Sequence, residues 1–135
     1  MRTLDAMIVR LENAGIGTGG LTIFAGSDVN LPDGGNPPLL SLAEAGGPDP
    51  TRFHNTSPLR HPTIQVTARG DIYDDVAALA DRAWDALGGG ATPLVNVVIG
   101  DVFFLTMHPY GDIMQLPVDA QQRVRLAFNV AMTRR

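Results

Sequence analysis

Residues 62–90, PTIQVTARGDIYDDVAALADRAWDALGGG, contain the clearest structural pattern of the chain. Apolar and polar residues alternate through the first part, and alternation with a period of two is typical of a strand with one buried face. We therefore predict a strand that ends near Gly70. Its two faces carry Ile64, Val66 and Ala68 on the core side and Gln65, Thr67 and Arg69 on the other.

The second part of this stretch has the spacing of an amphipathic helix. Asp71 stands where an N-cap is expected, and Gly88 is suited to end the helix. Asp74 and Asp75 would lie in the first turn, where unsatisfied backbone N–H groups favour negative charge. The predicted apolar stripe consists of Ile72, Val76, Leu79, Ala83 and Leu87, extended by Tyr73, Ala80 and Trp84.

Weaker patterns indicate the remaining elements. Helical spacing predicts a first helix over 3–14, with Thr3 as N-cap and Gly15 as the stop. GLTIFAG (20–26) is typical of a short strand, and Gly100-Asp101 is suited to a hairpin turn between two apolar runs. The last segment, RVRLAFNVAMTRR, alternates with a period of two, so we predict a strand there despite its helix-forming residues.

These elements predict an α+β fold with a largely antiparallel sheet and two helices packed on one face. The other face of the sheet would carry Gln65, Thr67, Arg69, Arg125 and Asn129. That set is too polar for a second core layer, so we expect it to line a subunit contact or a wet surface. With 135 residues, the chain is predicted to form one domain over 1–135.

Residues 27–62 are rich in proline and glycine, and only LLSLAEA (39–45) within them is suited to pair as a strand, as an edge ribbon. Long irregular segments in compact domains usually mark binding loops or arms. We interpret 27–62 as an extended loop or arm that contacts other proteins. The predicted protein-interaction residues are Asp33, Asn36, Arg52, Phe53, His54, Arg60 and Arg69.

Composition limits the classes of function. The net charge of −4 argues against broad electrostatic binding of nucleic acid or anionic lipid. The chain lacks cysteine, which removes disulfides, a thiolate nucleophile and cysteine ligands for zinc. No apolar run reaches the length of a spanning helix, and the N-terminal residues lack the apolar stretch of a signal peptide.

No catalytic motif is evident. The three histidines, His54, His61 and His108, lie beside proline or turn residues and do not have metal-ligand spacing. His61 and Asp71 are separated by a predicted strand of roughly 25 Å, at about 3.3 Å per residue. The glycine-rich GIGTGG follows a helix, which is the wrong context for dinucleotide binding. We therefore predict no catalytic residue, no cofactor and no metal.

A resemblance adds to this interpretation. The strand and helix of IQVTARGDIYDDVAALADRAWDALGG (64–89), the leading helix, the intervening loop and the closing alternating strand VRLAFNVAMTRR resemble tail terminator proteins of long-tailed bacteriophages. These proteins are often described as minor capsid or tail completion proteins. The resemblance covers nearly the whole chain in the order of elements, and its motifs are hydrophobic patterns with few fixed polar residues.

The resemblance implies a structural virion protein that forms a ring, commonly a hexamer, at the end of the tail tube. Such a ring stops elongation of the tube and provides the docking surface for the head connector. Its partners would be other copies of itself, the tail tube protein and the head-completion protein, and DNA would pass through the lumen without specific binding. The implied location is the tail or neck of the virion, after assembly in the host cytoplasm.

Three alternatives stay open from the sequence. The chain could be another neck or tail-tube component. It could be a small metal-dependent hydrolase that uses a histidine such as His61 with nearby aspartates. It could also be a peptide-binding adaptor that acts through the arm.

Overall fold

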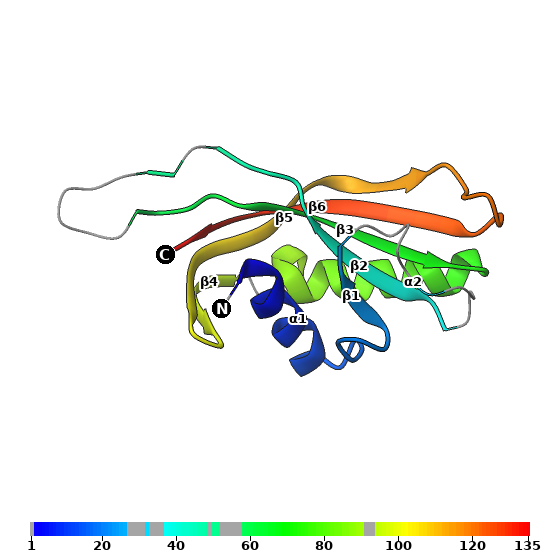
Figure 1. Ribbon diagram of the computed structural model, residues 1–135, viewed down its shortest axis with the longest axis horizontal. Helices are drawn as coiled ribbons and strands as arrows, with labels where there is room; N and C mark the ends of the chain where they lie inside the picture. Colours follow the sequence, from blue (N-terminus) through cyan, green and yellow to red (C-terminus); the bar gives the residue numbers. More distant parts are fainter. Residues whose placement is uncertain (1, 27–31, 33–36, 49, 52–57, 91–93) are drawn as a thin grey trace.

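The computed structural model describes residues 2–26, 32, 37–48, 50–51, 58–90 and 94–135, and it has an α+β architecture (Figure 1). The elements follow one another in an order that agrees with the predicted one. They are α1 (Thr3–Asn13), β1 (Ile23–Ala25), β2 (Leu39–Glu44), β3 (Thr63–Gly70), α2 (Tyr73–Trp84), a helical turn η2 (Asp85–Gly89), β4 (Leu94–Ile99), β5 (Val102–Leu116) and β6 (Val124–Arg134).

The strands form one six-stranded sheet in the order β1-β2-β3-β6-β5-β4. Only β1 and β2 pair in parallel, and every other neighbouring pair is antiparallel. The closing strand β6 therefore lies in the middle of the sheet, between β3 and β5. Its register places Phe128 opposite Val66, so the apolar sides of these two strands coincide.

Both helices pack their apolar stripes onto the sheet and share one core with it. Trp84 of α2 meets Phe128 of β6 edge-on, with ring centroids 5.3 Å apart and an interplanar angle of 67°. Such edge-to-face contacts add to the gain from burying the rings. The prediction of two helices on an antiparallel sheet is confirmed. Completely buried core side chains include Met7, Leu11, Leu40, Leu42, Ile64, Val66, Val76, Leu87, Phe104 and Phe128.

The helix starts differ from the predicted ones. α1 begins at Thr3 itself, with Arg2 before it, and the Thr3 hydroxyl accepts a hydrogen bond from Arg134 instead of capping the helix. α2 begins at Tyr73 and has Ile72, not Asp71, at its N-cap position, without a side-chain cap bond. Ile72 and Tyr73 are also about half exposed (55% and 52%), so they do not belong to the buried stripe. Ile72 lies before the helix and has an extended backbone (φ −110°, ψ 120°), so the helical spacing does not extend to it.

Gly88 ends the second helix as predicted. Its φ of +102° lies in the left-handed region that favours glycine. A Cβ added there would stand 2.1 Å from the carbonyl oxygen of Met107 on β5. Glycine thus both reverses the chain and lets the helix end touch the sheet.

The segment 27–62 is not one irregular arm. Residues 39–44 form β2, and Leu40 and Leu42 are completely buried in the core. β2 is also not an edge strand, because β1 pairs with its outer side. The prediction of an edge ribbon at 39–45 was wrong. The strand that covers its outer side, β1, is only three residues long and gives little sequence pattern.

Beyond β2 and β3, the described flanks of the segment continue as a two-stranded ribbon that projects from one end of the sheet (Figure 1). Thr51 and Leu59 exchange both backbone hydrogen bonds at 2.8 Å, and Thr63 N–H donates to the Gly46 carbonyl at 2.7 Å. We call residues 45–48, 50–51 and 58–62 the ribbon.

The polar face, which was expected to line a subunit contact or a wet surface, is not wet at Thr67 and Arg69, because both are buried within the chain. Thr67 and Arg69 are 4% and 3% exposed, whereas Gln65 nearer the ribbon is only half-buried. β5 also extends through Pro109 and Gly111, residue types typical of connections, to Leu116. A register irregularity between Tyr110 and Met114 accommodates the extra residues.

No helix in the described part of the chain is both long and apolar enough to cross a membrane.

Candidate assembly surfaces

Two of the seven predicted interaction residues lie in the described part of the chain. Arg60 is exposed on the ribbon, and Arg69 is buried at the opposite end of β3. The structure therefore does not bring these two together, because the length of β3 separates them. The other five, Asp33, Asn36, Arg52, Phe53 and His54, lie outside the described residues.

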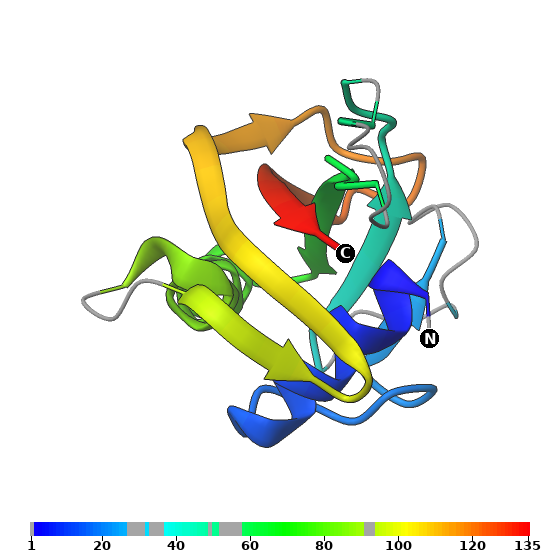
Figure 2. The ribbon, with the colours of Figure 1, turned by 90° about the vertical axis from the view of Figure 1, so that its left-hand side faces the viewer.

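A polar cavity of about 590 Å³ lies where the ribbon leaves the sheet. The N-terminus, the ribbon and the end of β6 meet at this end of the molecule (Figure 2). We call this cavity the arginine pocket, because three arginines and a single carboxylate, that of Glu44, are among its described lining residues. Its lining comprises Arg2, Thr3, Glu44, Gly46, Gly47, Pro48, Pro50, Arg60, His61, Pro62, Thr63 and Arg134.

Two of the pocket arginines are forced together by the backbone. Arg60 and Arg134 are directly opposite in an antiparallel bridge, and each backbone N–H donates to the other's carbonyl at 2.8 and 2.9 Å. Opposed residues of a hydrogen-bonded pair have Cα atoms only about 5.5 Å apart. Like charges in this position destabilise a sheet. Two arginines at these paired positions are therefore unfavourable for the local stability of the ribbon.

The electrostatics of Arg134 reflect this crowding. Burial lowers the pKa of its guanidinium, and the positive charge of Arg60 lowers it further, while the Asp101 carboxylate acts in the opposite direction. Arg134 also donates to the Thr3 hydroxyl at 3.0 Å and to the Arg135 main-chain oxygen at 3.1 Å. Its side chain is thus held in place beside the pocket.

Sequence reasoning missed Arg2 and Arg134 as pocket residues. The basic ending TRR was visible, but nothing in it indicated that β6 would bring Arg134 opposite Arg60. The only usable signal was the alternation of the last strand. That pattern predicts which face of the sheet each side chain lies on, but it does not predict which strand is the neighbour.

His61 has a structural role in this pocket. Its ring nitrogens lie 2.8 Å from the Thr51 hydroxyl and 3.2 Å from the Thr133 hydroxyl, so the ring ties the ribbon to β6. His108 lies exposed on β5. Among the described residues, no group of three or more histidine, aspartate or glutamate side chains is arranged to hold a metal ion.

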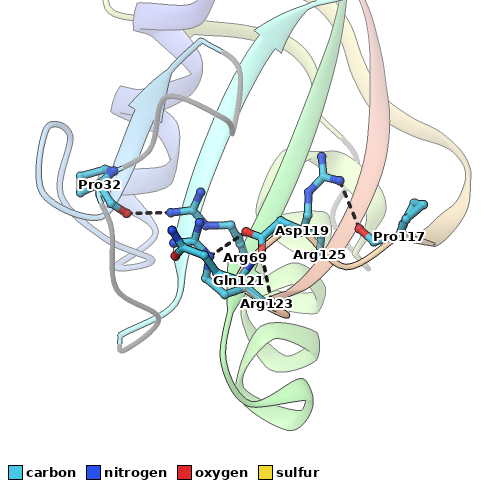
Figure 3. Close-up of polar contacts among 7 residues, drawn as sticks. All are labelled: Pro32, Arg69, Pro117, Asp119, Gln121, Arg123 and Arg125. Carbon is cyan, nitrogen blue, oxygen red and sulfur yellow. Dashed lines mark hydrogen bonds and ion pairs between the residues drawn. The ribbon is translucent and has the colours of Figure 1, made fainter.

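Arg69 belongs to a second polar cluster on the far end of the sheet (Figure 3). Its guanidinium donates to the Pro32 carbonyl at 2.7 Å, and Figure 3 places it beside the connection that links β5 to β6. In that connection Asp119 accepts from Arg123 Nε at 2.7 Å and from the backbone N–H groups of Gln121 and Arg123. These bonds lower the pKa of the Asp119 carboxyl, the backbone donor of Arg123 most strongly. The cluster fastens this connection.

The start of α2 forms a third surface, which we call the acidic knob and define as residues 71–75. Asp71, Asp74 and Asp75 are all exposed, and so are the apolar side chains of Ile72 and Tyr73 between them. The predicted acidic first turn is confirmed for Asp74 and Asp75. Tyrosine is among the residues enriched at protein interfaces, so the exposed ring of Tyr73 makes this surface a candidate contact.

Comparison with known proteins gives a likeness of fold without a match by sequence. No protein-family model matches the chain, and no curated protein matches it by sequence. Among solved structures, a chain of the virion of a native gene transfer agent particle has a similar fold, with a TM-score of 0.65 and 14% sequence identity. The match covers 98% of this chain and 93% of that chain. At this identity the likeness establishes a shared fold.

Proposed function

We propose that the chain is a structural, non-enzymatic protein of a phage-like virion, and specifically the tail terminator. In this role a ring of copies, most simply six, caps the finished tail tube, ends its elongation and offers a docking surface for the head connector. The observation that carries the proposal is the likeness of fold over nearly the whole chain to a gene transfer agent virion protein.

The arrangement of surfaces supports a protein that works by binding. The arginine pocket and the acidic knob lie at different ends of β3, so the molecule carries opposite charges at two separated places. The ribbon projects beyond the sheet and could reach a neighbouring subunit or the tube. Head-to-tail contacts between unlike surfaces generate rings when the rotation closes.

The charge balance also suits a channel for DNA. The chain has 14 acidic and 10 basic side chains, so a ring of copies would be strongly acidic. An acidic lumen repels the phosphate backbone and lets DNA pass without binding.

Loss of the protein from the assembling particle tests the proposal. Without a terminator, tail tubes should vary in length and exceed the normal length, and heads should remain unattached. Electron microscopy of particles assembled without this chain measures both features. Tails of uniform, normal length would contradict the terminator role.

A second candidate is another neck or tail-tube component, because the matched particle contains many proteins and the shared fold alone does not select one. Labelling the chain in intact particles separates the two. A terminator should appear as one ring at the head-proximal end of the tube. Labelling along the whole tube would instead identify a tube subunit, and labelling inside the head's portal would identify a connector component.

A further inference from the structure

The arginine pocket and the acidic knob carry opposite charges, and the apolar side chains of the knob are suited to pack on the prolines of the pocket. The pocket combines the guanidinium groups of Arg2, Arg60 and Arg134 with proline walls. The knob combines three exposed carboxylates with the exposed side chains of Ile72 and Tyr73. Arginine forks bind carboxylates in bidentate fashion, and tyrosine rings pack well on apolar surfaces such as proline.

Neither surface has a salt-bridge partner within the part of the chain that the structure describes. Among the described residues, no ion pair joins Arg2, Arg60 or Arg134 to a carboxylate, and the same holds for the three aspartates of the knob. Arg60 and Arg134 repel each other across the bridge, and a carboxylate placed between them would relieve that repulsion. The pocket therefore has a physical reason to take an anion from outside.

The two surfaces cannot meet within one molecule. β3 runs eight residues from the pocket end, at Thr63, to the end where α2 begins. At about 3.3 Å per residue this is a separation of roughly 26 Å. Figure 1 accordingly places the ribbon and the start of α2 toward opposite ends of the long axis. A contact between them has to join two copies.

We propose that the arginine pocket of one copy binds the acidic knob, residues 71–75, of a second copy. The interface is heterologous, because it joins unlike surfaces, and so it leaves a free pocket and a free knob at each end until a ring closes. This inference rests on the proposed ring and names the side chains that close it. DNA is a poorer occupant, since the pocket arginines lie beside the Glu44 carboxylate and the chain as a whole has a net charge of −4.

Disulfide trapping tests the contact directly, because the chain has no cysteine of its own. Pro48→Cys lies in the pocket and Ile72→Cys lies in the knob, so this pair leaves the arginines and aspartates in place. Under mild oxidation the double variant should give a ladder of cross-linked chains that ends at the ring size. Each single variant should stay uncrosslinked, since the interface does not bring like positions together.

A matched control uses the same pocket position with Ala120→Cys. Ala120 is exposed on the connection before β6, at the same end of the sheet as the knob. The pair Pro48→Cys with Ala120→Cys should give no ladder. Equal cross-linking of both pairs would indicate random collision and would overturn the proposed contact.

Charge reversal supplies an independent measurement. Arg60→Glu should weaken self-association in sedimentation by roughly tenfold or more, and Asp74→Arg with Asp75→Arg should do the same. A chain that carries all three changes should recover part of the association, because the new carboxylate at position 60 then faces the new guanidinium groups at positions 74 and 75. Circular dichroism and thermal melting confirm that each variant is folded, so loss of association cannot be attributed to unfolding.

The outcomes separate this inference from the proposed function. Oligomers that are insensitive to both reversals would overturn the pocket–knob contact and leave the ring intact. A wild-type chain that stays monomeric at all concentrations and shows no ring in the particle would overturn both. Loss of binding to another virion protein, with self-association unchanged in Arg60→Glu, would assign the pocket to that other partner.

Discussion

The two faces of β3 and β6 are buried by different means. On the helix side, apolar residues such as Val66 and Phe128 are covered by α1 and α2, whose own stripes match them. On the other side, Thr67 and Arg69 are also buried, and Arg69 lies next to the connection between β5 and β6, which specific polar bonds hold in place. The apolar burial can be predicted from the periodicity of the sequence. The burial beside the connection depends on polar contacts between distant segments, which periodicity does not predict.

Removing a large ring from the helix side should have the largest effect. Phe128→Ala deletes a completely buried side chain that also contacts Trp84, and we expect the free energy of unfolding to fall by about 3–5 kcal/mol. Urea denaturation followed by tryptophan fluorescence measures this change. A loss below about 1 kcal/mol would mean that the helices do not provide the main core.

Replacing the buried arginine on the other side should have a moderate effect. Arg69→Met keeps much of the side-chain length but leaves the Pro32 carbonyl without its donor, so we expect a loss of about 1–3 kcal/mol. The same denaturation experiment gives the value. Arg82→Met is a control, since Arg82 is exposed and its bond to the Gly15 carbonyl lies at the surface.

The Asp119 carboxylate in the connection near Arg69 should make the free energy of unfolding depend on pH in the acidic range. The pKa of Asp119 is lowered in the folded chain, so its carboxylate contributes stability above its ordinary value of 3.8, and this contribution is lost as pH falls through the lower folded pKa. Asp119→Asn should therefore flatten the dependence of melting temperature on pH below about 4. An unchanged acid profile in this variant would show that the carboxylate does not fasten the connection.

The smallest effect is expected at the ribbon. Arg60→Gln removes one of two facing positive charges on an exposed residue, so we expect stability to stay within about 0.5 kcal/mol of the wild type or to rise slightly. Thermal melting at low salt detects the change best, because screening is weakest there. A clear loss of stability would mean that Arg60 supports the fold, and it would weaken the case for a binding role.

Sequence patterns predicted the parts of the fold that depend on local periodicity. The helix over 73–84, the strand at 63–70, the hairpin turn at Gly100 and the final strand all appear where expected. They did not predict the second half of β5, because Pro109 and Gly111 are typical of connections. Pro109 is tolerated there next to an irregular stretch of the pairing with β6.

The candidate site was less predictable than the fold. Arg60 was singled out from composition, but its pairing with Arg134 joins residues 74 positions apart and depends on which strands become neighbours. Asp71 looked like a cap, yet Ile72 occupies that position, so the exposed apolar part of the knob was not foreseen. Pairwise contacts between distant segments lie beyond what alternation along one segment can encode.

The central place of β6 has a consequence for synthesis of the protein. β3 needs β6 as its neighbour, and β6 follows every other strand of the sheet along the chain, so it leaves the ribosome after them. Until residues 124–134 emerge, β3 and β5 each present an unpaired edge, and such edges are prone to pair with other chains. Because strand pairing at long sequence separation is slow, this chain should depend on chaperones more than a helical protein of equal length. The nascent chain is the stage at which aggregation competes most strongly with assembly.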